Sequence, residues 1–125
     1  MMSEAFSPHL FASSLDEWRD WLEKNCTVEK SVYLIVFHKS SSTKSVHWHE
    51  AIEHALCYGW VDSIAHKRDS ESCYLKFTPR NPRSKWGKKN IERAEKMIDL
   101  GFMRPNGFSL IEKAKETGKW AKPET

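Results

Sequence analysis

The sequence predicts an α+β domain in which about four helices pack on a small mixed three-stranded sheet, in the order α-β-α-β-β-α-α. Apolar residues recur at helical spacing in four segments. Residues 32–37, in a strand predicted over 31–38, are apolar at successive positions, as in a central strand. Residues 61–68 and 72–78 are joined by turn residues and predict a β-hairpin. With 125 residues and no internal repeat, residues 1–125 are expected to form a single domain.

The first helix is predicted over residues 14–25. Ser14 is its expected N-cap, and Glu17, three residues on, completes a capping box. Trp18 and Leu22 then follow one helical face. The residues before this helix, 1–12, are expected to be a loose lead-in.

The next two elements are a strand over residues 31–38 and a helix over residues 47–58. The strand is apolar on both alternating sets of positions, so we expect it to be covered on both faces. Gly59 is the natural residue to end the helix. Because this helix connects the strand at 31–38 with the strand at 61–68, we expect those two strands to be parallel. The hairpin then adds the strand at 72–78 in antiparallel orientation.

The last two helices are predicted over residues 84–100 and 105–117. Ser84 is the expected N-cap of the third helix, and Pro105 suits the first turn of the fourth. Residues 119–125 are expected to be a tail that Trp120 holds in place. Nine residues on the inward faces of these elements are expected to be buried: Trp18, Leu22, Leu34, Val36, Leu56, Trp60, Leu75, Ile91 and Ala94.

Composition excludes several classes of protein. Charged residues make up 30% and hydrophobic residues 39% of the chain, which is typical of a globular protein. The three cysteines form no C-x-x-C pair, so neither a disulfide framework nor a thiolate metal site is predicted. No run approaches the length of a membrane span, and the N-terminus lacks the pattern of a secretory signal. A cytoplasmic location is therefore expected.

Positive charge is concentrated in one segment. Residues 76–96 carry eight Lys or Arg and two Glu, a net charge of +6, whereas the whole chain has a net charge of only +3. Pro79 and Pro82 stiffen the loop before the third helix. Arginines held at a helix start favour binding of phosphate, sulfate or carboxylate. The competing interpretation is a solvated basic surface whose arginines pair with the acids of the chain, such as Asp62.

Several motifs carry a family resemblance. These are Trp18 with WLEKN at 21–25, ALCYGWVDS at 55–63, FTPRNPRSKW at 77–86, NIER at 90–93 and GFMRPNG at 101–107. With them, about residues 11–120 resemble the YdeI/OmpD-associated family, also called bacteriocin-protection proteins, a bacterial group. The resemblance implies a role at the envelope or in antimicrobial resistance, in a periplasmic setting that the lack of an export signal does not match. It implies no catalytic residues.

The motif residues form the candidate site. We expect a ligand pocket made by the loop cations and the start of the third helix, walled by two tryptophans and a carboxylate: Trp60, Asp62, Arg80, Arg83, Ser84, Trp86 and Lys88. Asp62 could orient a ligand or act as a base, but a structural ion pair is the more common role. Trp86 could stack on a ring, although core packing is again more common.

Two other groups invite a chemical interpretation. The segment around His47, His49 and His54 matches neither the H-E-x-x-H nor the H-x-x-E-H zinc motif, so no metal is expected there. Cys57 near the end of an apolar helix could be a nucleophile, but a buried free cysteine is usually a small hydrophobe.

The sequence thus predicts a non-enzymatic binding domain, without a cofactor or metal, that holds a small anionic ligand bearing phosphate or carboxylate. The alternatives are nucleic-acid binding through the basic third helix and, third, a small hydrolase or transferase that uses Asp62 or Cys57. Nucleic acid would give binding with a steep salt dependence.

Overall fold

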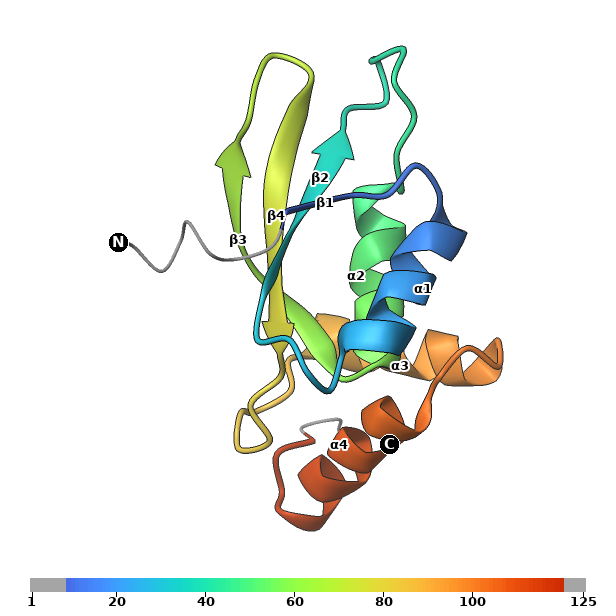
Figure 1. Ribbon diagram of the computed structural model, residues 1–125. Coiled ribbons are helices and arrows are strands. Elements are labelled where there is room, and N and C mark those ends of the chain that lie inside the picture. The colour runs from blue at the N-terminus through green and yellow to red at the C-terminus, as the bar shows by residue number, and fades with distance from the viewer. Residues whose placement is uncertain (1–8, 121–125) are drawn as a thin grey trace.

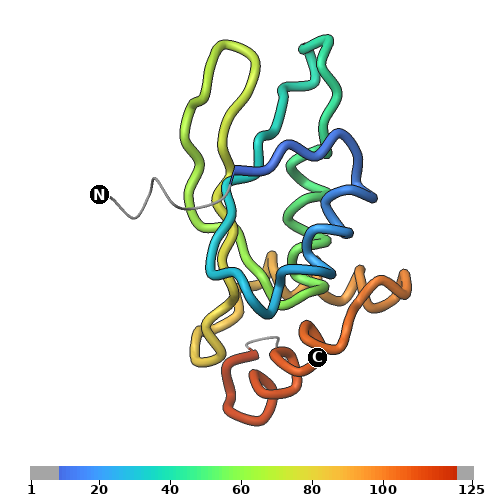
Figure 2. The backbone as a smooth tube through the Cα atoms, in the orientation of Figure 1, coloured from blue at the N-terminus to red at the C-terminus, as the bar shows by residue number. Residues whose placement is uncertain are grey.

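The computed structural model describes residues 9–120, which form four strands and four helices (Figures 1 and 2). In chain order the elements are β1 (His9–Phe11), α1 (Leu15–Asn25), β2 (Val32–Phe37), α2 (Trp48–Cys57), β3 (Trp60–Lys67), β4 (Ser72–Pro79), α3 (Lys88–Asp99) and α4 (Pro105–Glu116). The α+β class and the mixed sheet are as predicted. Six of the seven predicted elements have both ends within one residue of the prediction.

The sheet has the strand order β1-β2-β4-β3. β1 runs parallel to β2, while β4 is antiparallel to both β2 and β3. β2 and β3 therefore point the same way, with β4 of the hairpin inserted between them. Leu34 of β2 lies opposite Leu75 of β4, and a register shift between Asp62 and Ala65 interrupts the β3–β4 pairing. Such irregularities bend an edge strand.

The helices cover one face of the sheet. Figure 1 shows α1 and α2 side by side on that face, with α3 and α4 near the end where β4 finishes. The core lies between these layers, and all nine residues expected to be buried are at most 7% exposed. Trp18 and Phe77 meet there with ring centroids 5.0 Å apart, and the Trp18 indole N–H donates to the Ala51 carbonyl oxygen.

Two expectations about the fold were wrong. The lead-in contains a strand, β1, which pairs with β2, so the sheet has four strands and not the predicted three. The expected cover of β2 on both faces is confirmed in part. Helices lie on one face, and on the other Tyr33 is buried by the rings of His9, Tyr74 and His66, while Ile35 and Phe37 are half-buried. Residues 1–8 and 121–125 of the predicted lead-in and tail lie outside the described residues.

The second error concerns the start of α3. Ser84 is not its N-cap: the helix begins at Lys88, four residues later than predicted, and Gly87 caps it without a side-chain hydrogen bond. The Ser84 hydroxyl instead donates to the Asn81 carbonyl oxygen within a turn. A serine favours turns as well as helix starts. Here the turn is followed by Trp86, which pairs with Trp120 before the helix begins.

Candidate functional site

Arg80, the central residue of the predicted anion site, lies inside the fold. Its guanidinium carbon is 4.0 Å from the centre of the Trp86 ring, and its Nη2 donates to the Lys85 carbonyl oxygen at 2.9 Å. Only 8% of Arg80 is exposed, and burial lowers its pKa. Nε has no hydrogen-bond partner among the described residues. The arginine thus holds its own loop in shape. The partners of its guanidinium are Trp86 and Lys85, and Asp62, the partner considered from the sequence, is not one of them.

The other loop residues are dispersed. Arg83, at the tip, is exposed, and its backbone N–H donates to the Asn81 side chain. Lys88 is exposed in the first turn of α3. Trp86 is 3% exposed and packs on Trp120, with ring centroids 5.2 Å apart. Because Ser84 is not at the helix start, these side chains do not line a common pocket around it.

Trp60 and Asp62 start the same strand but lie in different surroundings. Trp60 is 1% exposed, donates its indole N–H to the Cys26 carbonyl oxygen and packs edge-on against Trp21. It is therefore a core residue. Asp62 is partly exposed and borders a pocket that contains none of the other predicted site residues.

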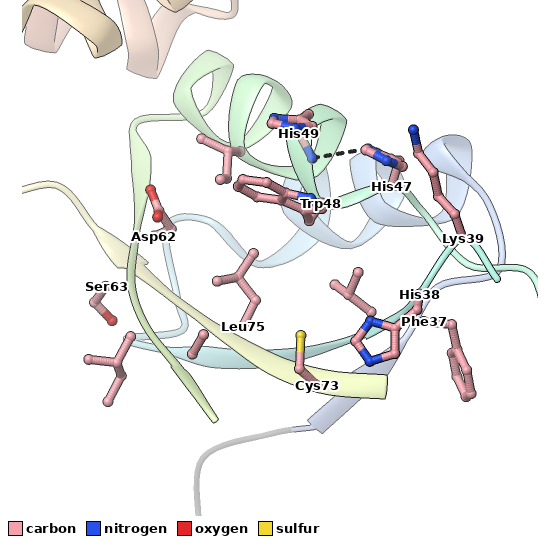
Figure 3. Close-up of a pocket in the computed structure, with 14 residues that line it drawn as sticks. Phe37, His38, Lys39, His47, Trp48, His49, Asp62, Ser63, Cys73 and Leu75 are labelled. Atoms are coloured by element: carbon pink, nitrogen blue, oxygen red, sulfur yellow. Dashed lines mark hydrogen bonds between the residues drawn. The ribbon is translucent and has the colours of Figure 1, made fainter. Parts of the chain in front are cut away.

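That pocket, here called the α2 pocket, has a volume of about 580 Å³ and lies between the start of α2, the end of β2 and the β3–β4 hairpin (Figure 3). Val36, Cys73 and Leu75 line it from the sheet, and Trp48 and Ile52 line it from α2. A volume of this size accommodates a small organic ligand. The hairpin extends beyond the helices that cover the sheet, which leaves this part of the sheet face open (Figure 1).

Basic side chains gather at one part of the α2 pocket. His38, Lys39, His47 and His49 all border it. They come from the loop after β2 and from the first residues of α2, where unpaired N–H groups and the helix dipole add positive potential. His47 is the N-cap of α2, and its Nδ1 accepts the His49 N–H at 3.3 Å. Only its Nε2 is therefore available to a ligand.

Cys57 and Cys73 are poorly suited to nucleophilic attack. All three cysteines are free. Cys73 borders the α2 pocket, and burial raises its pKa. Cys57 is fully buried and its thiol donates to the Glu53 carbonyl oxygen; burial raises its pKa too, against the opposing effect of Arg19. Since the thiolate is the reactive form, neither environment activates the sulfur.

His54 forms a buried polar group next to Cys57. It is 4% exposed, and the Arg19 guanidinium donates to its Nδ1 at 2.7 Å. Burial first, and then the positive charge of Arg19, lower the pKa of His54 to about 4. The imidazole is therefore neutral at physiological pH and acts as an acceptor for Arg19.

Sequence reasoning did not find Lys39 or Trp48, and it considered His47 and His49 only as metal ligands. One signal could have found the basic residues. A helix N-terminus favours anion binding, and Lys39, His47 and His49 lie in the loop before the helix predicted over 47–58 or within its start. Within residues 9–120, no group of three or more His, Cys, Asp or Glu could hold a metal ion. The helices of this part of the chain are also too short or too polar to cross a membrane.

The comparisons with known proteins give a family without a known function. Residues 10–110 match the family described as Domain of unknown function (DUF8412). Because this match covers most of the chain, the protein belongs to that family. Neither a curated protein nor a solved structure matches the chain significantly.

Proposed function

We propose that this protein is a non-enzymatic binding domain that holds a small anionic ligand, a phosphate or a carboxylate, in the α2 pocket. The observation that supports it is the gathering of Lys39 and three histidines around one cavity at the start of a helix. Charge-assisted hydrogen bonds to an oxyanion are about twice as strong as neutral ones. The site replaces the predicted one around Arg80, whose guanidinium is buried against Trp86.

A binding role also suits the other groups in the pocket. A hydrolase or transferase of the predicted kind would need Asp62 or a cysteine with a partner that activates it. Burial raises the pKa of Cys73, and Cys57 lies outside the pocket lining. Asp62 remains as an acceptor that can orient a ligand.

Thermal unfolding in sodium phosphate, compared with sodium chloride at equal ionic strength, tests the proposal. A ligand at one hundred times its Kd stabilises the folded state by about 2.7 kcal/mol. We expect phosphate to raise the Tm of the parent and to have less effect on Lys39→Met. Lys113→Met is the matched control, because Lys113 is an exposed lysine on α4 far from the pocket lining. If Lys39→Met gains as much from phosphate as the parent does, the proposal is wrong.

A second candidate is nucleic-acid binding. Four cations around the start of α3 are exposed: Arg83, Lys85, Lys88 and Lys89. Several phosphates bound together would give a steep decrease of affinity with salt, unlike a single anion in a pocket. Titration of a labelled oligonucleotide at several salt concentrations separates the two. A shallow slope, or no binding, argues against this candidate.

The kinship with the YdeI/OmpD-associated family and the protective role against bacteriocins are proposals as well. They depend on the sequence motifs, chiefly those at 56–63 and 77–86. A cytoplasmic location is also a proposal, and the free cysteines support it because they suit a reducing compartment. The protective role is tested by deleting the gene and measuring bacteriocin sensitivity. If the sensitivity does not change, the protein has no protective role.

A further inference from the structure

The α2 pocket has two chemically different ends. Figure 3 shows Asp62 and Ser63 at one end and His38 and Lys39 at the other, with Trp48 and Leu75 between them. One end therefore offers a carboxylate, the middle an apolar slot, and the far end a cation. A ligand that uses all three has a hydrogen-bond donor, a flat apolar body and an anionic group, in that order.

The middle of the pocket suits a ring. Trp48 is 45% exposed although it stands in the first turn of α2, and its ring lies 3.8 Å from that of His49. Buried Ile52 and Leu75 line the pocket, with Ile64 at its rim. An aromatic ring left partly open beside an apolar wall favours a planar ligand, because stacking and burial act together.

The cationic end continues into a second hollow of about 300 Å³, which shares Lys39 and His47 with the α2 pocket and adds Lys44 and Thr43. The hydroxyls of Ser41 and Ser45 are engaged in shaping this loop: Ser41 donates to Glu71 and Ser45 accepts the Phe37 N–H. Two lysines near one another offer enough charge for a phosphate ester, which carries up to two negative charges at neutral pH.

The carboxylate end selects among planar ligands. An ionised carboxylate accepts hydrogen bonds and donates none. Guanine presents two adjacent N–H donors on its Watson–Crick edge, which match the two oxygens of a carboxylate. Adenine presents one donor beside an acceptor nitrogen, which a carboxylate repels. Asp62 therefore favours guanine.

We propose that the α2 pocket binds a guanine nucleoside monophosphate, with the base between Asp62 and Trp48 and the phosphate at Lys39 and Lys44. The inference rests on the proposed function and specifies its ligand. The two pieces of the ligand occupy adjoining cavities that share four lining residues: Phe37, His38, Lys39 and His47.

Isothermal titration calorimetry with four probes tests this ligand class: GMP, AMP, phenyl phosphate and inorganic phosphate. We expect GMP to bind about tenfold or more tightly than each of the others, since one further good contact of about 1.4 kcal/mol corresponds to a factor of ten. Phosphate or phenyl phosphate that binds as tightly as GMP would overturn the nucleotide inference and leave the proposed function intact. No binding by any of the four would overturn both.

Variants locate the contacts. Asp62→Asn should remove the preference for GMP over AMP, and Trp48→Ala should weaken GMP about tenfold while leaving inorganic phosphate unchanged. The controls are Asp99→Asn and Phe108→Ala, an exposed acid on α3 and a 41% exposed aromatic on α4. The inference is contradicted if each pocket variant binds GMP with the same affinity as its control.

Site-resolved alkylation of the cysteines is a second readout. GMP should slow the labelling of Cys73, which lines the α2 pocket, and not that of Cys26, which lies outside both hollows.

Discussion

Arg80 stabilises the fold, although the sequence predicted that its side chain would bind an anionic ligand. Its backbone N–H donates to the Gly59 carbonyl oxygen, its guanidinium lies on the Trp86 ring, and Nη2 bonds to Lys85. These contacts join the end of α2 to the loop before α3. A guanidinium fits this place because it is planar and weakly hydrated, whereas an ammonium group is compact and strongly hydrated.

Arg80→Lys should therefore destabilise the fold by about 1–3 kcal/mol, as expected for the loss of a charged hydrogen bond and a stacked cation. Urea unfolding of the parent and the variant measures this change in the free energy of unfolding. Arg83→Lys, at an exposed position of the same loop, is the control and should change the free energy of unfolding by no more than about 0.5 kcal/mol. Equal effects of the two substitutions would show that the stacking on Trp86 contributes nothing.

At the scale of elements, α2 is the helix on which both core and pocket depend. α1, α3 and α4 each contact it, and its first turn carries Trp48 into the pocket. α4 approaches the end of α2 closely at Gly107: a Cβ atom there would lie 2.6 Å from the Cys57 carbonyl oxygen and 2.8 Å from that of Leu56. The glycine is thus required by the contact between two helices.

Gly107→Ala should destabilise the protein by about 1–3 kcal/mol or more, because backbone oxygens cannot move aside as a side chain can. Gly87→Ala is the matched control: Gly87 has a negative φ and open space around its Cα, so the alanine affects only the N-cap of α3, at a cost of about 0.5–1 kcal/mol. The Tm of both variants, measured by thermal unfolding, tests this prediction. A Gly107→Ala variant as stable as Gly87→Ala would mean that α4 moves away from α2 at little cost.

For the whole molecule, His54 links stability to pH. In the folded state burial, then Arg19, lower its pKa to about 4, with Lys96 acting in the same direction and Glu53 against it. Above the unfolded pKa of about 6.5, the imidazole is neutral in both states and has no effect. As pH falls from about 6.5 to 4, the unfolded chain takes up a proton that the folded state does not, and stability decreases.

The full loss from this group corresponds to about 3 kcal/mol, since each pKa unit is worth about 1.4 kcal/mol. His54→Gln keeps a side-chain acceptor for Arg19 but cannot titrate. The free energy of unfolding, measured from pH 7.5 to 4, should therefore fall more steeply for the parent than for the variant. Parallel curves would show that His54 is protonated in the folded protein as readily as in the unfolded chain.

Local patterns in the sequence determined most of the fold. Ser14 caps α1 as expected and accepts the Glu17 N–H, and residues at helical or alternating spacing form the core. Such features depend on neighbours within a few residues, so they can be read from a single chain. An anion-binding role could be proposed from the clustered charge of residues 76–96, but the pocket to which we assign it is lined by other residues.

Only the tertiary structure decided where β1 pairs, that β4 lies between β2 and β3, and which side chains share a pocket. Lys39, Trp48 and Asp62 come from three different segments of the chain and line one pocket, which is open because the hairpin extends past the helices. Arg80 and Ser84 lie in the most conspicuous basic segment, yet their partners are Trp86 and Asn81 within the same loop. Charge and spacing identify candidate groups, but packing between distant segments determines which of them remain available to a ligand.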